Sequence, residues 1–157
     1  MIKNNKKNLL FLILLNFILF FESKLFASEN VFFLSLKKNE VNLRQGPSFK
    51  YPIILTYKKK YLPIIILDKS ETWRKVKDFE SNVGWIHISQ LSKKKSAINI
   101  ENSSILFEKS TIFSKPVAKL EAGRLVLIER CKVKWCKINS DDFTGWTLKK
   151  YLWGTVN

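Results

Sequence analysis

Residues 73–91 read WRKVKDFESNVGWIHISQL, and residues 135–152 read WCKINSDDFTGWTLKKYL. Each stretch opens on a Trp, reaches a Gly-Trp pair ten or eleven residues later, and has a Leu six residues after the second Trp. Upstream, Val41 and Pro52 are eleven residues apart, as are Ile105 and Pro116. Aligned landmarks in nearly constant register indicate an internal repeat of just over 60 residues.

The segments inside each copy are typical of short strands. Residues 52–57 (PIILTY), 61–67 (YLPIIIL) and 124–128 (RLVLI) are rich in β-branched, aromatic and other apolar side chains. No stretch after the first 27 residues keeps an apolar helical period for three turns. The sequence therefore predicts an all-β protein built from two small β-barrels in tandem.

The first copy resembles the bacterial Src-homology-3-like (SH3-like) domain. The resemblance rests on VNLRQGPS at 41–48, YPII at 51–54, WRKV at 73–76 and GWIH at 84–87. The second copy keeps the tryptophan half, but LFEKST at 106–111 stands where the Asn-x-Arg-x-Gly-Pro element would be. The resemblance implies a five- to six-stranded barrel in each copy, and a class of modules that bind cell-wall peptides or proteins.

The chain divides into four expected segments, which are a signal peptide at 1–27, a first SH3-like barrel at 31–92, a linker at 93–102 and a second, diverged barrel at 103–157. Lysines 3, 6 and 7 precede an apolar run at 9–21, and Ala27 ends a short c-region. This order is typical of a secretory signal cleaved near Ala27, so we expect a periplasmic or secreted protein with no stable membrane span after cleavage. An uncleaved N-terminal anchor is the alternative.

The formal net charge is +15, and +12 remains after the first 27 residues are removed, because they hold four lysines and one glutamate. Such an excess favours anionic partners. The lysine runs at 58–60 and 93–95 are either contacts for an anionic polymer or solvated turns. Export makes nucleic acid an improbable partner, and we expect a monomer that contacts peptidoglycan or an envelope protein.

Candidate ligand-binding residues are Arg44, Tyr51 and Trp73 in the first copy, which retains the full turn element. The tryptophans either form the barrel cores or line an aromatic binding groove. Gly84 and Gly145 precede a Trp in a strand, which suggests a bulge or a close backbone approach. Gly46 is expected to need a backbone conformation that a side chain resists. The residues expected to be structural are Asn42, Gly46, Pro47, Gly84, Trp85, Trp135, Gly145 and Trp146.

The inventory of reactive side chains argues against an enzyme. His87 is the single histidine, and Cys131 and Cys136 are the two cysteines, so no four-ligand zinc cluster of Cys and His can form. A Cys136 nucleophile would have its only histidine in the other copy. We expect no catalytic residues, no metal and no cofactor, and a structural or merely exposed role for His87.

Four residues separate Cys131 from Cys136, a loop length that places the two opposite each other in a hairpin. We expect a disulfide there, with a buried thiol as the alternative. The expected function is an exported, non-catalytic binding module. The alternatives are an accessory or targeting subunit of a wall hydrolase and a purely protein–protein adaptor.

Overall fold

The computed structural model describes residues 31–156, so the expected signal peptide at 1–27 lies outside the described part. The described residues are all-β, with two short 3-10 helices. The first repeat consists of β1 (Phe32–Leu36), β2 (Val41–Arg44), β3 (Ile53–Tyr57), β4 (Pro63–Ser70), β5 (Trp73–Lys77), β6 (Val83–His87), η1 (Ile88–Gln90) and β7 (Leu91–Ser92). The second consists of β8 (Ser96–Asn99), β9 (Ser104–Phe107), β10 (Pro116–Leu120), β11 (Leu125–Cys131), β12 (Trp135–Ser140), β13 (Phe143–Leu148), η2 (Lys149–Tyr151) and β14 (Leu152–Gly154).

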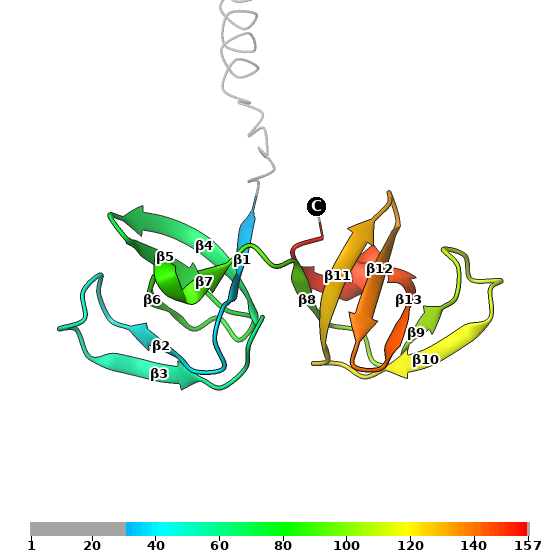
Figure 1. The fold of residues 1–157 in the computed structure, drawn as a ribbon, viewed down its shortest axis with the longest axis horizontal. Helices are drawn as coiled ribbons and strands as arrows, with labels where there is room; N and C mark the ends of the chain where they lie inside the picture. Colours follow the sequence, from blue (N-terminus) through cyan, green and yellow to red (C-terminus); the bar gives the residue numbers. More distant parts are fainter. Residues whose placement is uncertain (1–30, 157) are drawn as a thin grey trace, which may run out of the picture. The chain divides into compact units, whose positions relative to one another are not determined.

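The two repeats have the same topology. Their sheets run β3-β2-β6-β5-β4-β1-β7 and β10-β9-β13-β12-β11-β8-β14, so each strand of one has a counterpart seven strands later (Figure 1). All the pairings are antiparallel. The repeat read from the sequence is therefore a repeat of the fold.

The predicted closure into barrels is wrong. A sheet becomes a barrel only when its first and last strands pair. Among residues 31–156, β3 pairs with β2 alone and the two-residue β7 pairs with β1 alone, so the first sheet stays open. β2 meets β6 at one residue pair, Arg44 with Trp85, which shows how little pairing links the outer hairpin to the rest.

The two cores are mainly aliphatic. In the first repeat Leu36, Leu43, Ile64, Val76 and Ile86 are each fully buried. Since neighbouring side chains along a strand face opposite sides, Ile86 inside places Trp85 and His87 outside. The expectation that tryptophans form the cores holds in part: Trp73 and Trp146 are buried, but neither belongs to the aliphatic cluster of its repeat.

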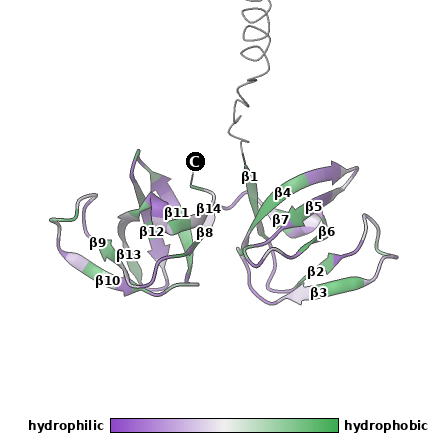
Figure 2. Cartoon of the chain, turned by 180° about the vertical axis from the view of Figure 1, so that it is seen from behind, coloured by the Kyte–Doolittle hydropathy of each residue, from purple (hydrophilic) through white to green (hydrophobic). Residues whose placement is uncertain are grey.

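β4 is buried at its start and exposed toward its end. Its sequence PIIILDKS runs from apolar to polar, and Figure 2 shows the matching change in hydropathy along the strand. The pairing with β5 shifts register between Ile66 and Asp68, where the exposed half begins.

The connection between the sheets is shorter than the expected linker at 93–102. Residues 96–99 form β8, which pairs with β11 and β14 and is buried along its length. Only residues 93–95 lie between β7 and β8. Trp153 of β14 packs edge-on against Phe33, at 5.0 Å between ring centroids, and against Phe79, at 5.4 Å. In the described residues, no helix has the length and apolar character needed to cross a membrane.

Candidate functional site

Arg44, at the end of β2, holds the loop that follows it. Its Nη1 donates hydrogen bonds to the carbonyl oxygens of Phe49, at 3.1 Å, and Tyr51, at 2.8 Å. Its guanidinium carbon lies 5.7 Å from the centroid of the Phe49 ring. Arg44 was predicted as a polar contact for a ligand, and the structure places it as the internal support of this loop.

The rings of Phe49, Trp73 and His87 pack together, two pairs edge-to-face and the third tilted. Phe49 is 4.9 Å from Trp73 and 5.5 Å from His87, and Trp73 is 5.3 Å from His87. Trp73 was a candidate ligand-binding residue from the sequence, but only 6% of it is exposed, while 61% of Phe49 is. The buried indole therefore supports an exposed phenyl ring.

Tyr51 completes this surface. It is 47% exposed, and its ring packs so closely on Gly46 that a Cβ there would lie 2.7 Å from Tyr51 Cδ1. The prediction of a special backbone conformation at Gly46 is wrong, because the positive-φ glycines of the described chain are Gly123 and Gly154. Gly46 is needed for the close ring. Pro47 lies next to it in the turn, half-buried.

We call Arg44, Phe49, Tyr51, Trp73 and His87 the aromatic cluster. Arg44, Tyr51 and Trp73 were candidates from the sequence, and the structure brings them together on one loop and the adjoining ends of β5 and β6. Phe49 was missed. Its signal was the repeat itself, since Phe113 stands 64 residues later, within the spacing of the other landmarks.

The remaining motif residues hold strands together. Asn42 Oδ1 accepts a hydrogen bond from Thr56 Oγ1 across the β2–β3 pair at 2.7 Å. At Gly84 an added Cβ would lie 2.7 Å from the Arg44 carbonyl oxygen. At Gly145 it would lie equally close to the Phe107 carbonyl oxygen, so both glycines admit a neighbouring backbone.

A buried polar pair lies below the loops of the first repeat. Tyr57 Oη donates to Asp78 Oδ2 at 3.0 Å, and Asn82 donates its backbone N–H to Oδ1 and its side-chain amide to Oδ2, each at 2.8 Å. Burial, followed by the charge of Asp78 and the hydrogen bond to it, raises the pKa of Tyr57 well above its usual value. The phenol is therefore a fixed donor.

The histidine and the two cysteines each make local contacts. His87 Nδ1 lies 2.8 Å from Ser89 Oγ and accepts the Ser89 N–H at 3.3 Å, so the ring caps η1. Cys131 and Cys136 are joined as a disulfide between paired residues of the β11–β12 hairpin. Within 31–156 no group of three or more His, Cys, Asp or Glu side chains is placed to hold a metal ion.

The second repeat carries different side chains at the same place. Trp135 pairs with Leu148 as Trp73 pairs with His87, and Phe107 pairs with Trp146 as Arg44 pairs with Trp85. Trp146 is covered by two cations, with the Arg130 guanidinium 5.4 Å and Lys132 Nζ 4.9 Å from its centroid.

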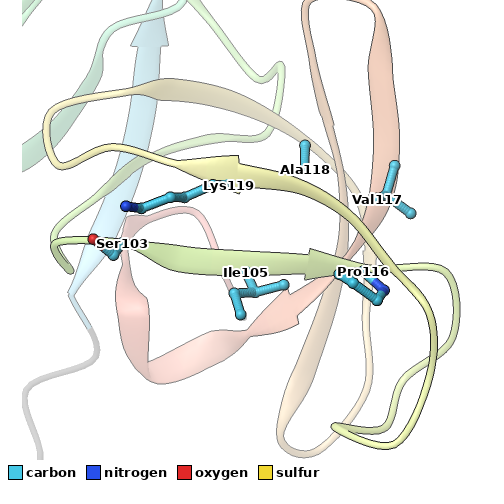
Figure 3. Close-up of a pocket in the computed structure, with 6 residues that line it drawn as sticks. All are labelled: Ser103, Ile105, Pro116, Val117, Ala118 and Lys119. Atoms are coloured by element: carbon cyan, nitrogen blue, oxygen red, sulfur yellow. The ribbon is translucent and has the colours of Figure 1, made fainter.

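A shallow hollow of about 460 Å³ lies along β9 and β10 of the second repeat, lined by Ser103, Ile105, Pro116, Val117, Ala118 and Lys119 (Figure 3). Figure 3 shows their side chains spread over both strands, with Lys119 the only charged group among them. Nothing in this set converges on a common point, so it is a weaker candidate than the aromatic cluster.

Comparison with known proteins gives a family and, among solved structures, low similarities. No curated protein matches the sequence. The solved structure of NlpC2 from Trichomonas vaginalis is similar over 81% of this chain and 49% of that one, with 13% identity and a TM-score of 0.37. NlpC1 from the same organism is similar over 80% and 46%, with 14% identity and a TM-score of 0.36. The chain spans about half the length of these structures.

A family model describing the bacterial SH3 domain matches residues 37–93 and 113–154. The two matches fall one in each sheet and together cover more than half of the chain. They coincide with the repeat seen in the sequence and in the strand order. The chain belongs to the bacterial SH3 domain family and carries two tandem copies of that domain.

Proposed function

We propose that this protein is a non-catalytic binding module of the periplasm or cell envelope, and that its first repeat binds peptidoglycan, its peptides or an envelope protein. The observation that carries the proposal is the pair of exposed rings, Phe49 and Tyr51, on a loop that Arg44 fixes. Rings held in place before binding lose little conformational entropy on contact. Apolar sugar faces and peptide side chains are suitable partners for such rings.

The family supports a binding role, since the bacterial SH3 domain is a binding-type domain common in cell-wall proteins. His87 Nδ1 lies 2.8 Å from Ser89 Oγ, and the same nitrogen accepts the Ser89 backbone N–H in the cap of η1. The two cysteines are joined to each other. We therefore assign structural roles to all three side chains.

Export is part of the proposal and is tested separately. The basic start, the apolar run at 9–21 and Ala27 support a signal peptide removed near Ala27. N-terminal sequencing of the protein from its native host should begin near Ser28. Full-length chain recovered from the cytoplasm would contradict export and leave the binding proposal to its own test.

The binding test is a pull-down of the purified protein with insoluble peptidoglycan in high salt, which removes general charge attraction. We expect Phe49→Ala to weaken retention about tenfold, because it removes the most exposed ring of the aromatic cluster. Phe143→Ala is the matched control, as Phe143 is 49% exposed on the β12–β13 turn of the second repeat. Equal retention of both variants would contradict the proposed site.

Two other outcomes identify the alternative functions. Retention of a wall hydrolase from an envelope extract, without retention on bare peptidoglycan, would indicate an accessory or targeting subunit. Retention of a different envelope protein alone would indicate an adaptor. Clearing of a wall substrate in a zymogram by the purified protein would contradict the non-catalytic assignment.

A further inference from the structure

We propose that the second repeat docks on an anionic lipid bilayer surface through two apolar loop tips surrounded by lysines. The β9–β10 loop exposes Ile112 by 60% and Phe113 by 93%, and the β11–β12 hairpin exposes Val133 by 90%. Phe113 and Val133 are the two most exposed large apolar side chains of the described residues. Apolar side chains this exposed mark interaction surfaces when they lie together.

The two tips belong to one surface. Leu148 lines a hollow with Ile112 and Phe107, and it also lines the neighbouring hollow with Val133. Trp135 joins them, since its ring is 5.9 Å from that of Phe107 and its backbone pairs with Leu148. We call this set, Phe107, Ile112, Phe113, Val133, Trp135 and Leu148, the apolar tip surface.

The apolar tip surface occupies the place of the aromatic cluster but has lost its polar members. By strand pairing, Phe107 stands where the first repeat has Arg44, and Leu148 stands where it has His87. Both changes replace a polar side chain by an apolar one. The second repeat is therefore suited to a different partner from the first.

Lysines surround the apolar tip surface. Lys132 and Lys134 flank Val133, Lys149 and Lys150 line the hollow beside it, and Lys109 and Lys115 flank the other tip. Within 31–156 none of the six takes part in an ion pair, and two of them, Lys132 and Lys150, lie over the rings of Trp146 and Tyr151. Glu101 lines the hollow that holds Ile112, and Glu108 precedes Lys109, so the six lysines outnumber these two carboxylates.

The hairpin tip is held in shape before any contact. The disulfide closes it, Lys132 N–H donates to the Trp135 carbonyl at 2.7 Å, and Lys149 N–H donates to the Lys134 carbonyl at 2.9 Å. These contacts fix the backbone around Val133, which is 90% exposed. This arrangement lets the apolar side chains enter the acyl boundary while the ammonium groups stay at the headgroups.

The apolar tips distinguish a lipid surface from a soluble polyanion. A polyanion would be bound by the lysines alone and would gain nothing from Phe113 or Val133. At a bilayer each lysine near the anionic surface strengthens binding by about five-fold. Each apolar side chain that enters the interface adds to this in proportion to its buried area.

The test is co-sedimentation of the purified protein with vesicles of phosphatidylcholine alone and with about 30 mol % phosphatidylglycerol, which makes the surface anionic. We expect binding to the anionic vesicles only. Phe113→Ser and Val133→Ser should each weaken it by about tenfold, and Lys134→Glu by about five-fold or more. Phe143→Ser and Lys119→Glu are the controls, because Phe143 lies at the other end of the β12–β13 pair and Lys119 on β10 away from the tips.

Two results would overturn the proposal. One is equal binding to both kinds of vesicle, or to neither. The other is a result in which Lys134→Glu loses vesicle binding while Phe113→Ser and Val133→Ser bind as the wild type does. If the protein also bound soluble polyphosphate as tightly as the anionic vesicles, the surface would be a polyanion site. Since Phe113 and Val133 are almost fully exposed, their variants should keep the wild-type melting temperature. The peptidoglycan pull-down with Phe49→Ala tests the first repeat independently of these outcomes.

Discussion

Replacing Tyr57 by Phe should lower the free energy of unfolding at neutral pH and remove part of its dependence on alkaline pH. The phenol is 8% exposed and donates one of three hydrogen bonds to the Asp78 carboxylate, which is 5% exposed. A hydrogen bond to a buried charged group contributes about 1.5–3 kcal/mol, so we expect a loss in that range at pH 7.

The pH dependence has a definite sign. Burial and the nearby carboxylate raise the pKa of Tyr57 in the folded state above the unfolded value of about 10. The stability from the neutral phenol is therefore complete below pH 10 and declines as pH rises above it, because the unfolded chain loses a proton that the folded chain keeps. The decline is about 1.4 kcal/mol per pH unit.

The assay is urea unfolding, followed by tryptophan fluorescence, of wild type and Tyr57→Phe at pH 7, 10 and 11.5. Since the variant has no phenol at this position, the difference between the two proteins should shrink above pH 10 by about 1.4 kcal/mol per unit, whatever the lysines contribute to both. A difference that stays constant from pH 7 to 11.5 would refute the assigned hydrogen bond and its buried setting.

Three further perturbations test other contacts. In thermal unfolding, Gly84→Ala should destabilise the first repeat by about 2 kcal/mol or more, because its Cβ would meet the Arg44 carbonyl. Gly46→Ala should destabilise it by about 1 kcal/mol or less, because the half-exposed Tyr51 ring can move. Equal losses of stability in the two variants would contradict this distinction. Reducing the disulfide should lower the stability of the second repeat by about 2 kcal/mol, since its closed loop is short, and intact mass with and without reductant checks the bond itself. Arg44→Gln should make the loop at 45–52 more sensitive to proteolysis by removing two hydrogen bonds to its carbonyls, with Arg124→Gln, an exposed ion-pair residue, as the unaffected control.

The repeat, the strand content and the family could be predicted because they depend on local chemistry. Gly84 and Gly145, each directly before a Trp, predict a close approach of a neighbouring backbone. Runs rich in β-branched residues, such as 61–67, favour strands wherever they lie in the chain. The sequence predicts a linker at residues 96–99 because this segment is short and follows three lysines. Its pairing with β11 and β14, which no local pattern indicates, makes it a strand.

The burial of individual rings could not be read from the sequence, because strand phase decides it. Trp85 and Ile86 are neighbours, and either could face the core until the pairing partners are known. Trp73 could be placed only once Phe49 was known to fold back over it, a contact across 24 residues that no local pattern encodes. The role of Arg44 could not be predicted either, because its guanidinium can donate hydrogen bonds equally well to the carbonyls of a loop or to a ligand.

The open sheets give the chain free strand edges, and these bear on self-association. An outer strand with unpaired N–H and C=O groups can accept a strand from another molecule. β3 follows directly after Pro52, and β10 begins with Pro116 and loses register before Ala118. Proline lacks a donor, and a bulge twists an edge away from flat pairing. These features hinder edge-to-edge pairing with a strand of another molecule.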